Sequence, residues 1–234
     1  MSKLLSIIIP CFNEKNNIEK IIKKILQIKK IKKQIIVVDD KSTDGSVKKI
    51  LKFKKRIDKI FVHKKNKGKG ACIKTAKKYI KGDIVIIQDA DLEYYPSDYY
   101  KLIRPIINKK SKVVYGSRVL GKSKKQLKVN FYNPDIRVLG NYILTKISNF
   151  LNDQNLTDAH TCYKVFDAKL FKSLHLKEND FAFCPEITSL ISKKKIKILE
   201  LPIKYKGRSI EDGKKIRFLD AIKALKTLLT EKIR

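Results

Sequence analysis

Two acidic residues, Asp89 and Asp91, follow the mostly apolar run Ile84–Gln88. At the end of a β-strand, side chains two positions apart point to the same side. Two neighbouring carboxylates repel each other unless a cation lies between them, and Mg²⁺ or Mn²⁺ takes such oxygen ligands together with substrate phosphates. We therefore predict a divalent metal site at Asp89 and Asp91, with Glu93 as a third ligand or as a group behind the ligands. The alternative is a polar turn in which the Asp residues cap the next helix.

Polar residues also end two other apolar runs: Asn13-Glu14 after Leu4–Ile9, and Asp39-Asp40 after Gln34–Val38. Ligands of open α/β sheets bind at the carboxyl ends of the strands, so these side chains are predicted to share one cleft with Asp89 and Asp91. The Asp40 carboxylate can accept hydrogen bonds from a base edge or a ribose hydroxyl. Its alternative role is a helix cap together with Asp44.

The segment Gly68-Lys69-Gly70 is predicted to let the backbone approach a ligand and to place a cation beside it. It is too short for a P-loop and lacks the G-K-[ST] ending of one. The three histidines, at positions 63, 160 and 175, have no metal-ligand spacing, so a structural or surface role is expected for each.

Apolar runs of strand length alternate with segments of helical periodicity through the first half of the chain. Strands are predicted at Leu4–Ile9, Gln34–Val38, Ile60–Val62 and Ile84–Gln88, with helices over Ile18–Leu26, Val47–Leu51 and Ala71–Ile80. Such alternation indicates βαβ units, hence an α/β fold with a mostly parallel central sheet flanked by helices.

The second half is less regular. Strands are predicted at Val113–Tyr115 and Lys197–Ile203, a polar mobile loop at 119–136, and helices over Leu139–Leu151, Phe181–Ile191 and Ile216–Leu229. The last helix is amphipathic, with Lys223 and Lys226 near its apolar side. It either lies on an anionic membrane surface or packs on the preceding domain with its lysines in water.

The chain of 234 residues carries a formal net charge of +32, from 55 Lys+Arg against 23 Asp+Glu. This charge favours polyanions such as phosphorylated substrates, anionic lipid or nucleic acid. The alternative is an ordinary lysine-rich surface. The lysines form no tail and no nucleic-acid motif is recognisable, so no nucleic-acid partner is expected.

The four cysteines are far apart, which is typical of a reducing compartment and indicates neither a disulfide framework nor a zinc site. No apolar stretch reaches the ~18 residues that span a bilayer. The apolar run Leu4–Ile9 is cut short by Pro10 and lacks a small-residue cleavage site, so we do not interpret it as a secretory signal.

Several segments in this order resemble family 2 glycosyltransferases, which have the GT-A nucleotide-sugar-binding fold. They read SIIIPCFNE, IIVVDDKSTDGS, NKGKGACIKTA, IVIIQDADLEYYP and VVYGSR, over residues 6–118. Two further segments, TDAHTCYKVF and PIKYKGRSIEDGKKI, are similar to the polyprenyl-phosphate branch of dolichyl-phosphate mannose synthase-like enzymes. The resemblance implies a GT-A catalytic domain at 1–215, with a nucleotide-sugar half at 1–118 and an acceptor half at 119–215, followed by the amphipathic helix at 216–234.

The resemblance also implies roles for individual residues. Pro10, Phe12 and Glu14 lie under the nucleotide, Asp40 contacts the base, Lys69 lies near the base or ribose, and Asp89, Asp91 and Glu93 hold the metal. Four basic positions are implied to bind the acceptor phosphate: Arg118 and Arg137 meet it, and the C-terminal pair Arg208 and Lys215 can close over the phosphates. Asp158 matches a proposed acceptor-side base. The aromatic-arginine stretch that relatives have before Arg137 reads NFYNPDIRVLGN here, which is a departure.

The activity that the resemblance implies is inverting, metal-dependent transfer of a hexose from a UDP- or GDP-linked sugar to a polyprenyl phosphate, at the cytoplasmic face of a membrane. An acceptor phosphate is already an anion near pH 7, because its second pKa is about 6. Asp158 is therefore expected to be an orienting or metal-side group rather than an essential proton acceptor. The alternatives are a family 2 enzyme with a non-lipid acceptor in surface polysaccharide synthesis and, more remotely, a non-catalytic nucleic-acid-binding protein.

Overall fold

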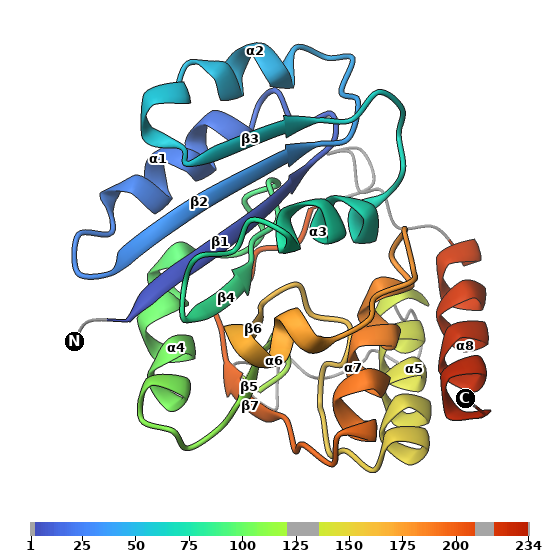
Figure 1. The fold of residues 1–234 in the computed structure, drawn as a ribbon. Helices are drawn as coiled ribbons and strands as arrows, with labels where there is room; N and C mark the ends of the chain where they lie inside the picture. The colour runs from blue at the N-terminus through green and yellow to red at the C-terminus, as the bar shows by residue number, and fades with distance from the viewer. Residues whose placement is uncertain (1–2, 121–135, 209–217, 234) are drawn as a thin grey trace.

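One seven-stranded sheet runs through the computed structural model, with strand order β3-β2-β1-β4-β6-β5-β7 (Figure 1). The structure describes residues 3–120, 136–208 and 218–233, without the side chains at 136, 137, 218 and 219. The strands are β1 (Leu4–Cys11), β2 (Lys32–Asp39), β3 (Lys59–Val62), β4 (Ile84–Ile87), β5 (Val113–Ser117), β6 (Lys164–Asp167) and β7 (Leu199–Pro202). The helices are α1 (Ile18–Gln27), α2 (Ser46–Leu51), α3 (Lys69–Lys77), α4 (Tyr99–Ile107), α5 (Ile136–Asn152), α6 (Ala168–Ser173), α7 (Phe183–Lys193) and α8 (Phe218–Ile233), with 3-10 turns at Lys54–Arg56 and Pro96–Asp98.

The first four strands are parallel and form the predicted half of the sheet. β1 pairs with β2 on one side and β4 on the other, so that Ile7 lies opposite Ile35 and Ile86. Both faces of β1 are covered, because α1 and α2 lie on one side of this half and α3 on the other (Figure 1). A strand buried on both faces is mostly apolar, which is why β1 reads LLSIIIPC, and its buried Ser6 hydroxyl donates to Gln34 Oε1 at 2.6 Å.

Three elements were not predicted: α4, β6 and α6. β6 runs antiparallel to both β4 and β5, so the sheet is parallel only in part. The strand is four residues long and begins with a buried lysine, Lys164, which interrupts the apolar pattern on which the prediction depended. α4 contains Pro105, an ordinary sign against a helix interior.

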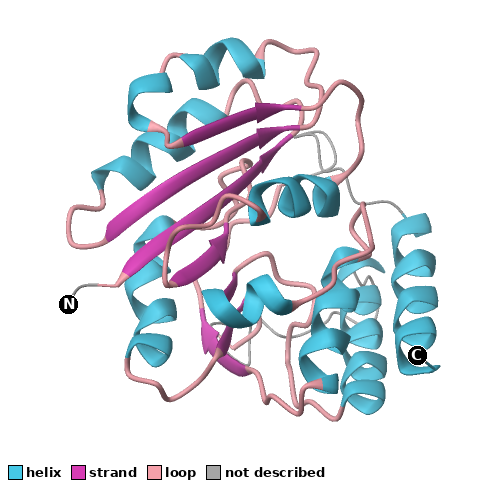
Figure 2. Cartoon of the chain, viewed as in Figure 1, coloured by secondary structure: helices cyan, strands magenta, loops and turns pink. Residues whose placement is uncertain are grey.

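The predicted elements are present with shifted ends (Figure 2). The helix expected over Ala71–Ile80 begins at Lys69 and ends at Lys77, and the strand expected over Lys197–Ile203 is shorter, at Leu199–Pro202. The last helix extends to Ile233. Residues 121–135 of the predicted loop, and residues 216 and 217 of the predicted last helix, lie outside the described residues.

The last helix, α8, packs against α7 and α5 (Figure 1). Ala224 and Leu228 are buried in this contact, and Lys193 of α7 pairs with Glu231. The helix therefore docks on the domain, one of the two arrangements expected for it. Within the described ranges, none of the helices is both long and apolar enough to cross a membrane.

Candidate active site

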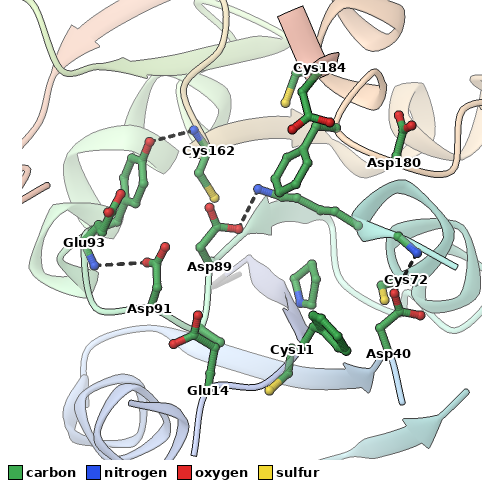
Figure 3. A pocket seen from close by; sticks show the side chains of 18 of the residues that line it. Cys11, Glu14, Asp40, Cys72, Asp89, Asp91, Glu93, Cys162, Asp180 and Cys184 are labelled. Carbon is green, nitrogen blue, oxygen red and sulfur yellow. Dashed lines mark hydrogen bonds and ion pairs between the residues drawn. The ribbon is translucent and has the colours of Figure 1, made fainter. Parts of the chain in front are cut away.

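A cleft of about 660 Å³ lies at the carboxyl ends of β1, β2 and β4, within the range of small-molecule sites. Ten predicted site residues line it: Pro10, Phe12, Glu14, Asp40, Lys69, Asp89, Asp91 and Glu93 of the nucleotide-sugar and metal site, and Arg118 and Arg208, expected at the acceptor phosphate. Figure 3 shows Asp89, Asp91, Glu93 and Glu14 on one side of the cleft, with Asp40 and Cys72 farther along it. The parallel strands thus bring together acids that are up to 79 positions apart in the chain.

The acids that follow β4 are crowded. The Asp91 carboxylate accepts one backbone hydrogen bond, from the Glu93 N–H at 3.1 Å. Burial, and after it the nearby charges of Asp89 and Glu93, together raise the pKa of Asp91 to about 7, although the charge of Arg208 acts in the opposite direction. A raised pKa means that another positive charge at this position would be stabilising.

Arg208 links the acids from three segments of the chain. Its Nη2 atom lies 3.2 Å from Glu14 Oε1 and 3.2 Å from Asp91 Oδ2, and its backbone N–H donates to Glu93 Oε1 at 2.9 Å. The Tyr205 hydroxyl donates to the other oxygen of Glu93 at 2.7 Å. The segment after β7 therefore closes one side of the cleft through charged contacts.

Lys69, the first residue of α3, reaches the acids from the opposite side. Its Nζ lies 2.6 Å from Asp89 Oδ1, and the side chain is 12% exposed. Burial acts to lower the pKa of Lys69, but Asp89, with the thiols of Cys162 and Cys184, outweighs it, so the pKa lies well above its usual value. Lys69 is thus a permanent cation beside Asp89.

The glycines that flank Lys69 serve packing within the protein. A Cβ atom at Gly68 would lie 2.5 Å from the Asn179 carbonyl oxygen, and one at Gly70 would lie 2.5 Å from that of Glu178. Gly68 also has a φ of +95°, which side chains rarely adopt. The expected close approach of backbone is present, but the partner described is the 178–180 segment, which is held against the start of α3.

Asp40, expected at the base, is committed to its own loop. Its carboxylate accepts hydrogen bonds from the Lys67 N–H at 2.9 Å and the Gly68 N–H at 2.6 Å, and contacts His63 Nδ1 at 2.7 Å. The other ring nitrogen of His63 lies 2.9 Å from Thr75 Oγ1. Asp40 therefore fixes the loop that leads to Lys69, while also lining the cleft.

Two groups of side chains are candidates for a metal ion. Asp40, His63 and Cys72 each offer one ligand atom, all within 4.8 Å of one another, in a mixed oxygen, nitrogen and sulfur set. Since the Asp40 oxygens already accept backbone hydrogen bonds, we interpret this group as a hydrogen-bonded support. The acids after β4 offer only oxygen atoms as ligands, and the charges of Asp89 and Glu93 contribute to the raised pKa of Asp91. Both properties fit a hard divalent cation such as Mg²⁺ or Mn²⁺.

Arg118 and Asp158 form a buried pair. Arg118 Nε and Nη2 each lie 2.7 Å from an Asp158 oxygen, and the guanidinium lies over the Tyr205 ring at 5.2 Å. Burial acts to raise the pKa of Asp158, but Arg118 outweighs it, so the pKa is about 2. Asp158 is fully buried behind Arg118, and its backbone N–H donates to Glu200 at 2.9 Å. This arrangement makes it a holder of Arg118.

Two predicted basic residues are not located by the described structure. Arg137 lies in the first turn of α5, where only the backbone is described, and Lys215 lies outside the described residues. Both remain expectations from the sequence.

The sequence did not predict that all four cysteines line the cleft. Cys11, Cys72, Cys162 and Cys184 are buried thiols that form no disulfide, and they come from four different elements or loops (Figure 3). Tyr205 and His160 were also not assigned to it. The Tyr-Lys-Gly-Arg stretch at 205–208, an aromatic residue beside basic ones, is the signal that could have indicated Tyr205.

The chain matches the model of the family described as glycosyl transferase family 2 over residues 6–174. Similar proteins include a UDP-N-acetylglucosamine–dolichyl-phosphate N-acetylglucosaminyltransferase of Methanococcus voltae, 30% identical over 86% of this chain and 85% of the relative. A dolichyl-phosphate beta-glucosyltransferase of Trichomonas vaginalis is 27% identical over 96% of this chain and 72% of the relative. The resemblance to the polyprenyl-phosphate branch is thereby confirmed.

The fold is similar to that of glucosyl-3-phosphoglycerate synthase from Mycobacterium tuberculosis, solved in complex with Mn²⁺, UDP and glucosyl-3-phosphoglycerate. The TM-score is 0.73, with 98% of this chain and 80% of that chain covered, at 16% sequence identity. At this identity the likeness establishes the fold, and the predicted GT-A class is confirmed.

Proposed function

The chain belongs to glycosyl transferase family 2, and we propose that it transfers a hexose, with inversion, from a UDP- or GDP-hexose to a polyprenyl phosphate. The observation that carries the proposal is the group of acids after β4, which lies in a cleft between two protein cations, Lys69 and Arg208. Such a site fits a diphosphate and a divalent cation together. Two relatives whose names specify dolichyl phosphate support the acceptor class.

The donor diphosphate would lie beside Asp89 and Asp91. These two carboxylates, with Glu93 behind them, would hold Mg²⁺ or Mn²⁺, and the ion would supply Lewis-acid stabilisation of the leaving diphosphate. Lys69 and Arg208 lie on opposite sides of these acids, and each can donate charge-assisted hydrogen bonds to phosphate oxygens. Their present pairing with Asp89 and Asp91 keeps both side chains oriented toward the site.

Arg118 is proposed to bind the acceptor phosphate. Asp158 holds two of its guanidinium nitrogens and the Tyr205 ring supports its face, so the side chain has little freedom to move. A guanidinium has five N–H donors, and those not directed at Asp158 are available to a phosphate. Arg137 and Lys215 are proposed from the sequence to add to this charge.

The reaction then needs no protein base. A phosphate oxygen of the acceptor attacks the anomeric carbon from the side opposite the nucleoside diphosphate, the bond to that diphosphate breaks, and the configuration inverts. The Asp158 carboxylate keeps its charge because Arg118 holds its pKa at about 2, so its contribution is to hold Arg118 in place.

A transfer assay tests this function. The protein is incubated with UDP-glucose, UDP-N-acetylglucosamine or GDP-mannose, with and without Mn²⁺, and with either a short polyprenyl phosphate or a phosphorylated non-lipid acceptor. We expect a glycosyl phosphate lipid of inverted configuration, formed only with metal. Product on the non-lipid acceptor alone would overturn the lipid assignment, and metal-independent turnover would overturn the metal role.

We also propose that a face formed by α5 and α8 contacts an anionic membrane. Both helices carry exposed apolar side chains: Val138, Tyr142, Ile143 and Phe150 on α5, and Ile222, Leu229 and Ile233 on α8. The most exposed of these, Phe150 and Ile233, are each 87% exposed. Lys146 and Lys226, also exposed, add positive charge beside them, and each basic residue at such a surface contributes about 1 kcal/mol.

Flotation with phosphatidylglycerol vesicles at low and high salt measures this contact. Ile143→Ser/Phe150→Ser should weaken vesicle binding about thirtyfold, since each substitution removes roughly 1 kcal/mol of apolar transfer energy and a factor of ten corresponds to about 1.4 kcal/mol. Tyr100→Ser is the matched control, because Tyr100 is 59% exposed on α4, away from this face in Figure 1. Equal flotation of both variants and the wild type would exclude the α5 side of the face.

A further inference from the structure

The loop of residues 157–164, which leads into β6, is tied to the rest of the protein by almost every polar side chain it has. The Thr157 hydroxyl donates to Glu200, Asp158 pairs with Arg118, the Thr161 hydroxyl donates to the Gly116 carbonyl, and the Tyr163 hydroxyl donates to Gln88. Within the loop, Lys164 Nζ donates to the Ala159 carbonyl. A loop held at this many points is rigid, so its side chains keep their positions when a ligand binds.

His160 is the exception in this loop. It lines the cleft, yet its Nε2 atom is buried and has no hydrogen-bond partner among the described residues. Leaving a buried polar atom without a partner costs about 1–3 kcal/mol, and native proteins do so rarely. Such an atom at the wall of a binding cleft indicates that a partner arrives with the ligand.

The ring is suited to a neutral partner. Burial, and after it the charge of Lys164, lowers the pKa of His160 to about 4, so the imidazole is neutral at physiological pH. A neutral imidazole offers one N–H donor and one acceptor nitrogen, the same pair that a hydroxyl group offers in return. The phosphates already have dedicated cations in Lys69, Arg118 and Arg208.

The position of His160 in the loop indicates which part of the bound substrates it can contact. Two residues before it, Asp158 holds Arg118, the proposed anchor of the acceptor phosphate. Two residues after it, the Cys162 thiol lies beside Asp89, in the proposed diphosphate site. The transferred hexose must lie between the departing diphosphate and the attacking phosphate, which is the interval that the 158–162 segment spans.

We propose that His160 determines sugar specificity by hydrogen bonding to a hydroxyl group of the hexose being transferred. The inference rests on the proposed function, because it needs a nucleotide sugar in this cleft. The contact is made in addition to those with the nucleotide and diphosphate, so it affects binding of the nucleotide sugar but not of the nucleotide alone.

Paired titrations test the inference. Binding of UDP and GDP, and of UDP-glucose, UDP-galactose and GDP-mannose, is measured by calorimetry with Mn²⁺ for the wild type, His160→Ala and His160→Gln. We expect His160→Ala to weaken binding of the preferred nucleotide hexose five- to twentyfold, to reduce discrimination between epimers, and to leave binding of the nucleoside diphosphate unchanged. His160→Gln keeps a donor and an acceptor and should recover much of the loss.

Three outcomes are distinguishable. Equal weakening of nucleotide and nucleotide hexose, or no weakening of either, overturns the role of His160 while the proposed function stands. Failure of the wild type to bind any nucleotide hexose overturns the proposed function itself. His175→Ala, at an exposed histidine, is the matched control and should behave as the wild type, and a thermal melt of each variant identifies loss of folding.

Discussion

Two kinds of buried acid lie in and beside the cleft, and the protein holds them differently. Asp40 and Asp158 each accept backbone hydrogen bonds and contact a basic side chain, His63 and Arg118 respectively. Asp91, between Asp89 and Glu93, accepts one backbone hydrogen bond and shares Arg208 with two other acids. In the first kind, hydrogen bonds and a basic side chain stabilise the carboxylate. In the second, several carboxylates lie together and Arg208 neutralises only part of their charge.

This difference separates acids that stabilise the fold, Asp40 and Asp158, from an acid of the proposed ligand-binding site, Asp91. A carboxylate that makes all its hydrogen bonds inside the protein costs little to keep and has little left for a ligand. Burial and like charges raise the pKa of a carboxylate such as Asp91, so its ionised form lowers the stability of the folded protein. Such groups are common at functional sites, where a positively charged ligand or ion can stabilise the ionised form. Three variants, in four measurements, test the distinction.

The largest effect is expected from Asp91→Asn on activity. The substitution removes a negative charge from the proposed diphosphate site, so we expect sugar transfer to fall at least 10³-fold, equivalent to about 4 kcal/mol of transition-state stabilisation. Initial rates with saturating nucleotide sugar and metal measure it. If the variant kept more than a tenth of the wild-type rate, Asp91 would not belong to the proposed metal and diphosphate site.

Asp158→Asn should have the next largest effect, on stability. Removing the charge leaves Arg118 buried without its partner, and we expect the free energy of unfolding to fall by about 3 kcal/mol at pH 7. The folded pKa of about 2 lies below the unfolded value, so this stabilisation is present above pH 4 and is lost as the pH falls toward 2.

Urea unfolding of the wild type and Asp158→Asn at pH 7 and pH 3 checks both statements. The difference between the two proteins should be smaller at pH 3. A difference that is the same at both pH values would show that the Asp158 charge is not what stabilises this region.

Asp40→Asn is expected to cost less, about 2 kcal/mol of unfolding free energy. The amide that replaces one oxygen brings an N–H group against the Lys67 and Gly68 N–H donors, so at least one backbone hydrogen bond is lost. Faster amide hydrogen exchange at Lys67 and Gly68 would locate the effect. Asp153→Asn is the control, because that carboxylate is 96% exposed, and it should change nothing measurable.

The smallest effect is expected from Asp91→Asn on stability, measured without metal. The substitution relieves repulsion from Asp89 and Glu93 and weakens the contact with Arg208, so the free energy of unfolding should change by no more than about 0.5 kcal/mol or rise. The same variant thus gives the largest loss of activity and the smallest loss of stability. A loss of 2 kcal/mol or more would place Asp91 with the supporting acids.

The β1–β4 half was predictable because its strands are buried on both faces and their sequences show it directly. β1 and β2 are apolar over most of their length, and the acids that end β2 and β4 mark the edge where ligands bind. The half that contains β6 was less predictable, because a four-residue strand with a buried Lys164 and a helix with an internal Pro105 violate the local patterns. Tertiary contacts, such as that of Lys164 Nζ with the Tyr115 ring at 3.7 Å, allow these exceptions.

The sequence by itself determined the order of strands and helices in the first half and the presence of adjacent acids after β4, since both depend on residues a few positions apart. Only the tertiary structure decided how those acids are held. Arg208 reaches Glu14 across 194 positions, Arg118 meets Asp158 across 40, and Asp40 turns toward Lys67 and Gly68 rather than toward open solvent. Local spacing limits where a side chain can point, whereas its partner is selected by packing of the whole chain, which periodicity does not encode.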